Sequence, residues 1–218
     1  MLDFIYSLRG TENASSHMIV GADFIWLHFP KTGGMSTESA LRLLRPDAVF
    51  DPIDPNNVIW HHGIHARKRY DASFSPAGKR VICGFRRLPH WLLSRVLFEA
   101  SRPPYRTITR EMLVQGQFFE QDGDLNTPNK YARAYSSYPV DDWIRIEHAA
   151  DDLAQALRLK PEAVRSFFTK KNASPSYPKN IGFWFTPSEL ARLYDLCPDW
   201  TRIERKVYGD ILTLPEEA

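Results

Sequence analysis

The segment Pro30-Lys31-Thr32-Gly33-Gly34-Met35-Ser36-Thr37 has the composition of an anion-binding loop. Its two adjacent glycines let the backbone turn tightly and approach a ligand closely. Its lysine supplies a full positive charge, and its serine and threonines supply hydroxyl donors for anionic oxygens. The segment therefore predicts a cradle for a phosphate or a similar anion.

Two flanking elements would position this loop. The apolar run Phe24–Phe29 predicts a buried strand before it. Residues 36–44 place Ala40, Leu41, Leu43 and Leu44 at helical spacing after it. A helix that starts at the loop points its free N–H groups and the positive end of its dipole at the ligand. The anion site is therefore expected at a strand-to-helix turn.

The rest of the chain alternates apolar runs with helical patterns. Further strands are expected at Val58–Trp60, Arg80–Phe85 and Trp143–Ile146. Helices are expected between and after these strands, and the best defined of them cover residues 91–97, 149–157, 187–196 and 201–208. Strands that alternate with helices favour a parallel sheet covered on both faces, which is the α/β class.

Length and composition limit the classes of function. A chain of 218 residues fits one domain, placed at 23–210, with an N-terminal extension of unclear role at 1–22 and a tail at 211–218. The 28 basic and 26 acidic side chains give a net charge of +2, too balanced for a non-specific nucleic-acid binder. Two cysteines make no disulfide framework, and no CxxC or HExxH motif indicates a metal site. No apolar stretch approaches the roughly 20 residues of a membrane span, so a cytoplasmic location is expected.

The order of the loop residues carries a resemblance to a known family. In the P-loop of kinases the lysine follows the glycines, whereas Lys31 precedes Gly33 and Gly34. Pro-Lys-Thr-Gly-Gly after a strand ending in His28-Phe29 resembles the 5′-phosphosulfate loop of sulfotransferases that use 3′-phosphoadenosine 5′-phosphosulfate (PAPS). The likeness is strongest to the carbohydrate branch, such as the heparan sulfate 2-O-sulfotransferases, and to its bacterial relatives.

This resemblance implies a fold, a reaction and a donor. The implied fold is a P-loop-like three-layer α/β domain with a central parallel sheet flanked by helices. The implied reaction moves a sulfuryl group from PAPS to an acceptor hydroxyl on a carbohydrate or glycoconjugate and leaves 3′-phosphoadenosine 5′-phosphate (PAP). By resemblance, the residues that wrap the 5′-phosphate and the sulfuryl group are Lys31, Thr32, Gly33, Gly34, Met35, Ser36 and Thr37. Met35 stands where many relatives carry threonine, so one hydroxyl contact is lost there.

A second motif of the family binds the 3′-phosphate of the donor. It consists of an arginine at a strand end and a serine eight residues later, and it resembles Arg86 and Ser94. Arg87 is a rival for the arginine role, because the residues after Arg86 depart from the family's Arg-Asp-Pro opening. A late loop of the family closes over the nucleotide, and the residues that match it here are Lys170, Lys171, Asn172 and Ser174.

The base that removes the acceptor proton is expected in the segment His61-His62-Gly63-Ile64-His65. Histidine is a natural general base near neutral pH, and relatives carry a histidine base between the two nucleotide motifs. His65 fits a Gly-x-His element and is the first choice, and His62, directly before Gly63, is the second. The predicted catalytic residues are therefore His65, Lys31 and His62. Lys31 neutralises the departing phosphate oxygen, so no metal is expected.

Two alternative functions remain open. A small-molecule kinase would use the loop for ATP, but it needs an acidic residue that holds Mg²⁺ near the loop, and the sequence supplies none clearly. A non-catalytic nucleotide- or glycan-binding module would have the loop without a base beside the sulfur position. The expected partners are a nucleotide sulfate donor and a hydroxyl-bearing acceptor whose identity the sequence leaves open.

Overall fold

The computed structural model describes residues 18–51, 61–101, 103, 105–120, 123–168 and 177–215. Within these residues, five strands form the central sheet in the order β3-β1-β2-β4-β7. They are β1 (Met18–Val20), β2 (Phe24–Leu27), β3 (Val49–Phe50), β4 (Arg80–Phe85) and β7 (Asp142–Arg145). A separate ribbon pairs β5 (Phe118–Phe119) with β6 (Leu125–Asn126).

The central sheet is mixed. β2 is parallel to β4, with Phe24 opposite Arg80, and β4 is parallel to β7, with Ile82 opposite Asp142. β1 is antiparallel to both β2 and β3. The connection from β1 to β2 is a tight turn, closed by a hydrogen bond from the Gly21 N–H to the Phe24 carbonyl, and so short a link permits only an antiparallel pair. The expected parallel sheet therefore holds for β2, β4 and β7, but not for β1 and its pairings.

Alternate residues of the strands face two separate hydrophobic cores, as the pleat of a strand requires. One core takes Ile25, Leu27, Val81, Cys83 and Phe85. The other takes Phe24, Trp26, Ile82 and Ile144. A strand that is covered on both faces is apolar at nearly every position, which explains the continuous apolar runs in the sequence of β2 and β4.

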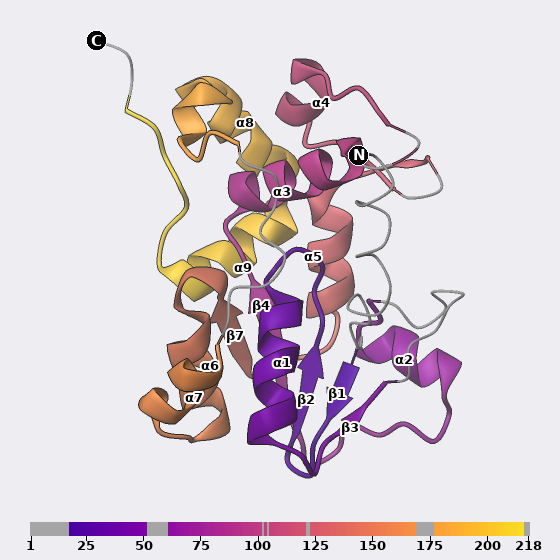
Figure 1. Ribbon diagram of the computed structural model, residues 1–218. Coiled ribbons are helices and arrows are strands. Elements are labelled where there is room, and N and C mark those ends of the chain that lie inside the picture. The colour runs from indigo at the N-terminus through magenta and orange to yellow at the C-terminus, as the bar shows by residue number, and fades with distance from the viewer. Residues whose placement is uncertain are drawn as a thin grey trace, which may run out of the picture.

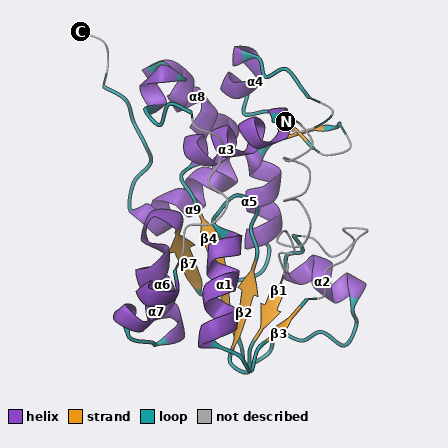
Figure 2. Cartoon of the chain, in the orientation of Figure 1, coloured by secondary structure: helices purple, strands orange, loops and turns teal. Residues whose placement is uncertain are grey.

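Helices cover both faces of the sheet, so the molecule has three layers (Figure 1). The helices α1 (Gly34–Leu44), α6 (Ala149–Leu157) and α7 (Pro161–Phe167) contribute to one core. The helices α3 (Leu88–Ala100), α5 (Pro128–Ser136), α8 (Pro187–Leu196) and α9 (Pro198–Tyr208) contribute to the other. Two short helices, α2 (Ile64–Tyr70) and α4 (Arg110–Val114), lie toward the margins in Figure 2, where the strands are seen between the helices.

The sheet begins inside the segment that the sequence assigned to the N-terminal extension, 1–22. Met18 and Ile19 of β1 are buried, one in each core. The strand expected at Arg80–Phe85 is β4, and the strand expected at Trp143–Ile146 is β7, shifted by one residue. The strand expected at Val58–Trp60 lies outside the described residues. In the described ranges, no helix is long and apolar enough to cross a membrane.

The carboxyl ends of β2, β4 and β7 meet at one edge of the sheet, because these strands are parallel. The glycine loop follows β2, and Arg86 follows β4. In open α/β sheets, ligands bind at this edge. The fold thus brings the two motifs that the sequence singled out to the same edge of the sheet.

Candidate active site

The glycine loop leads directly into helix α1. Gly33 occupies the N-cap position with φ of +80°, a left-handed conformation that glycine adopts without strain. The N–H groups of Ser36 and Thr37 donate to the Gly33 carbonyl at 3.1 and 3.2 Å. Lys31 also has a positive φ, +64°, which is uncommon outside glycine. The chain therefore turns twice within three residues before the helix begins.

A close contact explains the second glycine of the loop. A Cβ atom added to Gly34 would lie 2.0 Å from Nε2 of His28, well inside van der Waals contact. His28 follows β2 and is only 7% exposed. The first turn of α1 therefore sits directly on this buried imidazole, and only glycine leaves room for it.

Two hydroxyls of the loop bind the loop itself. The Thr32 hydroxyl donates to the Phe29 carbonyl at 2.8 Å, and the Thr37 hydroxyl donates to the Gly33 carbonyl at 3.3 Å. Both side chains are buried, with 2% and 1% of their surface exposed. The sequence predicted that these threonines contact a ligand, but in this structure their hydroxyls brace the backbone of the loop.

Helix α3 holds the loop from the other side. The Trp91 indole N–H donates to the Pro30 carbonyl at 2.7 Å. The Lys31 ammonium lies 3.7 Å from the centre of the ring of Phe98, which is on α3 and 67 positions away in the chain. Such a cation–π contact holds the ammonium against α3. The side chain that the sequence assigned to catalysis is thus oriented by α3.

Arg86 and Arg87 differ in what they bind. The Arg87 guanidinium pairs with Glu204 at 3.3 Å and with Asp210 at 2.7 Å, and it lies over the Tyr208 ring. The Arg86 guanidinium is half-buried, and its Nη1 is 3.5 Å from the Lys31 carbonyl. Its Nε is buried and has no hydrogen-bond partner in the part of the chain that the structure describes. Arg86 is therefore the arginine with donor capacity left for a ligand.

The surroundings of Arg86 are positively charged. Burial, and next the positive charge of Arg86, lower the pKa of the neighbouring His90 from its ordinary value. Lys179 and Arg87 act in the same direction, and Glu147 opposes them. Arg86, Lys179 and Arg87 thus all act on His90, although Arg87 itself is paired with Glu204 and Asp210.

For the other residues expected around the donor, the structure gives only their position or their burial. Ser94 lies on α3 and is 1% exposed, so its hydroxyl is enclosed by protein. Met35 and Ser36 belong to the first turn of α1 and are partly exposed. The loop residues Lys170, Lys171, Asn172 and Ser174 lie outside the described residues.

The histidine segment runs from the sheet edge into helix α2. His65 is exposed on α2, where its Nε2 donates to the Ser137 carbonyl at 3.1 Å and its ring meets the edge of Tyr138. The His62 ring meets Tyr70, also on α2. Neither of these contacts is with the glycine loop, so the choice of His65 or His62 as the base stays a prediction.

A third histidine, His61, reaches the strand that carries the loop. Its Nδ1 is 2.9 Å from the His28 carbonyl, and its ring centre is 4.9 Å from that of His28. A carbonyl only accepts, so Nδ1 carries a hydrogen, and in the neutral ring the lone pair is then on Nε2. Tyr135 fixes the same corner, since its hydroxyl lies 2.9 Å from the His28 carbonyl and 2.8 Å from the His61 carbonyl.

His61 is not among the bases predicted from the sequence, because those predictions rest on the spacing of the histidines from Gly63. The backbone of His61 also marks this residue in the structure, because its φ is +56°. A non-glycine residue in this region is strained, and such strain gathers at functional sites. Neither the contact with His28 nor the strain can be read from local sequence.

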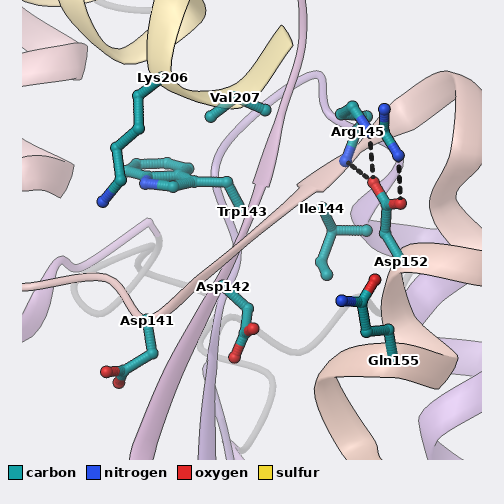
Figure 3. Close-up of a pocket in the computed structure, with 9 residues that line it drawn as sticks. All are labelled: Asp141, Asp142, Trp143, Ile144, Arg145, Asp152, Gln155, Lys206 and Val207. Carbon is teal, nitrogen blue, oxygen red and sulfur yellow. Dashed lines mark hydrogen bonds and ion pairs between the residues drawn. The ribbon is translucent and has the colours of Figure 1, made fainter. Parts of the chain in front are cut away.

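An open hollow of about 380 Å³ lies elsewhere, along the outer edge of β7 (Figure 3). It is lined by Asp141, Asp142, Trp143, Ile144, Arg145, Asp152, Gln155, Lys206 and Val207. Three of its charged side chains are already in ion pairs, Asp142 with Arg80 at 2.7 Å and Arg145 with Asp152 at 2.7 Å. None of the residues predicted to bind the donor lines this hollow, so we do not assign the chemistry to it.

No family model matches the chain, and no match was found among curated proteins or solved structures. Among the described residues, no group of three or more histidine, cysteine, aspartate or glutamate side chains is placed to hold a metal ion. The site is therefore defined by its own geometry: a glycine loop, a lysine, an arginine whose buried Nε has no partner among the described residues, and a histidine beside the strand that precedes the loop.

Proposed function

We propose that this protein is a sulfotransferase that moves a sulfuryl group from PAPS to an acceptor hydroxyl. One observation carries the proposal. The Arg86 guanidinium lies 3.5 Å from the Lys31 carbonyl, although 55 positions separate the two residues in the chain. The loop expected to bind the 5′ side of the nucleotide and the arginine expected to bind its 3′-phosphate are thus neighbours.

The donor would lie across the carboxyl edge of β2 and β4. The 5′-phosphate and the sulfuryl group would rest on the amides at the start of α1, with Lys31 beside them. The 3′-phosphate would rest against Arg86, whose buried Nε lacks a partner in the described part of the chain. A guanidinium carries five N–H donors in a planar fork, which suits a phosphate.

Transfer needs one bond to form as another breaks. The acceptor oxygen attacks sulfur, the bond between sulfur and the bridging phosphate oxygen breaks, and the electron pair leaves on PAP. The acceptor proton passes to a histidine, and the Lys31 ammonium neutralises the charge that develops on the bridging oxygen. The step therefore balances with the donor, the acceptor, the base and the lysine, and it needs no further reactant.

His61 is the histidine whose contacts favour the role of base. It is hydrogen-bonded to the His28 carbonyl, three residues before Lys31. That bond leaves the lone pair on Nε2 and fixes the ring. His65, the choice from spacing, is bound instead to Ser137 and Tyr138. A histidine base is therefore kept in the proposal, with His61 placed ahead of His65 and His62.

The acceptor follows only from the family resemblance, which favours a carbohydrate or glycoconjugate. A transfer assay with ³⁵S-labelled PAPS across glycans, lipids and phenols tests the reaction. Label in one acceptor class, with PAP as co-product, is the expected result. PAPS that stays intact with every acceptor, while the protein binds ATP with Mg²⁺, would favour the kinase alternative. Binding of PAPS without transfer would favour a non-catalytic module.

A further inference from the structure

The side chain of Glu204 joins three elements behind the donor site. It lies on α9 and is fully buried, with no exposed surface. One carboxylate oxygen accepts from the Leu88 N–H at 2.7 Å, at the start of α3. The other accepts from the Tyr194 hydroxyl at 2.7 Å and from the Arg87 guanidinium at 3.3 Å. The Arg87 contact spans 117 positions of the chain.

A second side chain of α9 holds the neighbouring residue. The Trp200 indole N–H donates to the Arg86 carbonyl at 3.2 Å. The Trp200 ring is fully buried and packs on Phe85, the last residue of β4, with ring centres 5.1 Å apart. Helix α9 therefore binds three consecutive residues where β4 passes into α3: the carbonyl of Arg86, the guanidinium of Arg87 and the amide of Leu88.

These contacts bind the side chain of Arg87 but only the backbone of Arg86. Glu204 draws the Arg87 guanidinium toward α9, and Asp210 binds its other end at 2.7 Å. Arg86 is held by its backbone, and its guanidinium is left to approach the Lys31 carbonyl. A buried carboxylate is costly unless it is paired and hydrogen-bonded, and Glu204 meets that condition through these partners. Burial raises the pKa of Glu204, while the bonds from Leu88 and Tyr194 and the charge of Arg87 oppose that shift.

We propose that Glu204, supported by Trp200, is a positioning residue that sets which arginine meets the 3′-phosphate of the donor. This inference rests on the proposed function, because it assumes that Arg86 binds that phosphate. Glu204 does not touch the donor. It acts through Arg87, Leu88 and the chain direction after β4, so its loss should affect the selectivity for a 3′-phosphate more than nucleotide binding in general.

The test compares Glu204→Gln with a matched control, Asp210→Asn. Each variant removes one carboxylate from Arg87, but Asp210 is 70% exposed, whereas Glu204 is buried and also accepts from the Leu88 N–H of α3. Calorimetry measures binding of PAP and of adenosine 5′-phosphosulfate, which lacks the 3′-phosphate. For Glu204→Gln we expect PAP binding to weaken about tenfold and adenosine 5′-phosphosulfate binding to stay within about twofold. Asp210→Asn should keep both affinities.

Other outcomes have distinct meanings. If Glu204→Gln keeps the wild-type ratio of the two affinities, the positioning role is wrong and the proposed function stands. If wild-type protein does not prefer PAP to adenosine 5′-phosphosulfate, the proposed donor itself is wrong. Should Glu204→Gln fail to fold, Trp200→Phe decides by the same ratio, because it removes the bond to the Arg86 carbonyl and keeps a ring in the core. An unchanged ratio in Trp200→Phe would then overturn the inference.

Discussion

The cationic residues at the carboxyl edge of the sheet are prepared for an anion to different degrees. Arg87 is already paired with two carboxylates, so a ligand would have to compete for it. Lys31 rests on the Phe98 ring. A cation–π contact of this kind contributes about 0.5–1 kcal/mol at exposed sites, whereas a hydrogen bond to a charged group contributes about 1.5–3 kcal/mol. A bound phosphate would therefore draw the lysine from the ring.

The first prediction concerns Lys31. If its charge neutralises the bridging oxygen as the bond to sulfur breaks, it acts mainly in the transition state. Replacing Lys31 by alanine should then lower kcat by roughly 10²-fold or more, as the loss of other charge-stabilising donors does. The exposed Lys160, at the N-cap of α7, serves as the control and should tolerate alanine. Turnover of Lys31→Ala within a few-fold of wild type would remove Lys31 from the mechanism.

The second prediction concerns Arg86. Its guanidinium is expected to bind the 3′-phosphate, so Arg86→Ala should weaken PAP binding by about 1.5–3 kcal/mol, the value of a charged contact. Binding of adenosine 5′-phosphosulfate should change much less, because that nucleotide lacks the group. Titration calorimetry measures both affinities. Equal losses for the two nucleotides would point to a structural role for Arg86.

The third prediction ranks the histidines. A general base works only when neutral, so transfer should decline as the solution becomes acid enough to protonate it. We expect His61→Ala to remove most transfer activity and to leave PAP affinity nearly unchanged, because the donor contacts come from other residues. His65→Ala should be milder. The ratio of turnover to PAP affinity distinguishes the variants. Greater loss in His65→Ala would return the role to the histidine chosen from spacing, and full activity in both would require a carboxylate base.

At the scale of elements, the site depends on how the ends of two strands are packed. The parallel register of β2 and β4 places Leu27 opposite Cys83, so that the loop and Arg86 leave the sheet side by side. Helix α1 then starts on top of His28, and α3 holds the loop through Trp91. The turn has little freedom, because it is fixed from below by the histidine and from the side by the indole.

Gly34→Ala tests this packing. The new Cβ would lie 2.0 Å from His28 Nε2, so either the imidazole or the first turn of α1 must move. Overpacking of this kind costs about 1–3 kcal/mol, which we expect as a lower free energy of unfolding together with weaker PAP binding. Gly182→Ala is the matched control, since its Cβ would have its nearest neighbour, Asn180 Oδ1, at 3.4 Å. Denaturant unfolding of both variants measures the difference. Equal stability of the two would contradict the close contact.

At the scale of the whole molecule, residues at the site are bound by segments from distant parts of the chain. Helix α9, near the end of the described chain, fixes the residues after β4 through Glu204 and Trp200. Helix α5 fixes the corner between His28 and His61 through Tyr135. The core face that holds α3, α5, α8 and α9 is therefore the support of the site, as well as a source of stability.

The parts of the site that follow from local chemistry could be predicted from the sequence. The lysine and the two glycines of the loop, and the strand Arg80–Phe85, can be recognised from residue types and spacing. The α/β class follows from the alternation of strand and helix patterns. The motif favoured Arg86 and left Arg87 as a rival, because the contact that distinguishes them, between Arg87 and Glu204, spans 117 positions of the chain. His61 was missed for a similar reason, since its partner His28 lies 33 positions earlier. The three-residue strand β1 was too short to give a pattern.

The most direct measurement of the central claim is a comparison of nucleotides by calorimetry on the whole chain. Wild-type protein should bind PAP in the presence of a metal chelator, and it should bind PAP more tightly than ATP with Mg²⁺, because Arg86 and the loop around Lys31 provide for a 3′-phosphate and a 5′-phosphate without a metal. The contradicting result is tight binding of ATP that requires Mg²⁺, with no preference for the 3′-phosphate of PAP.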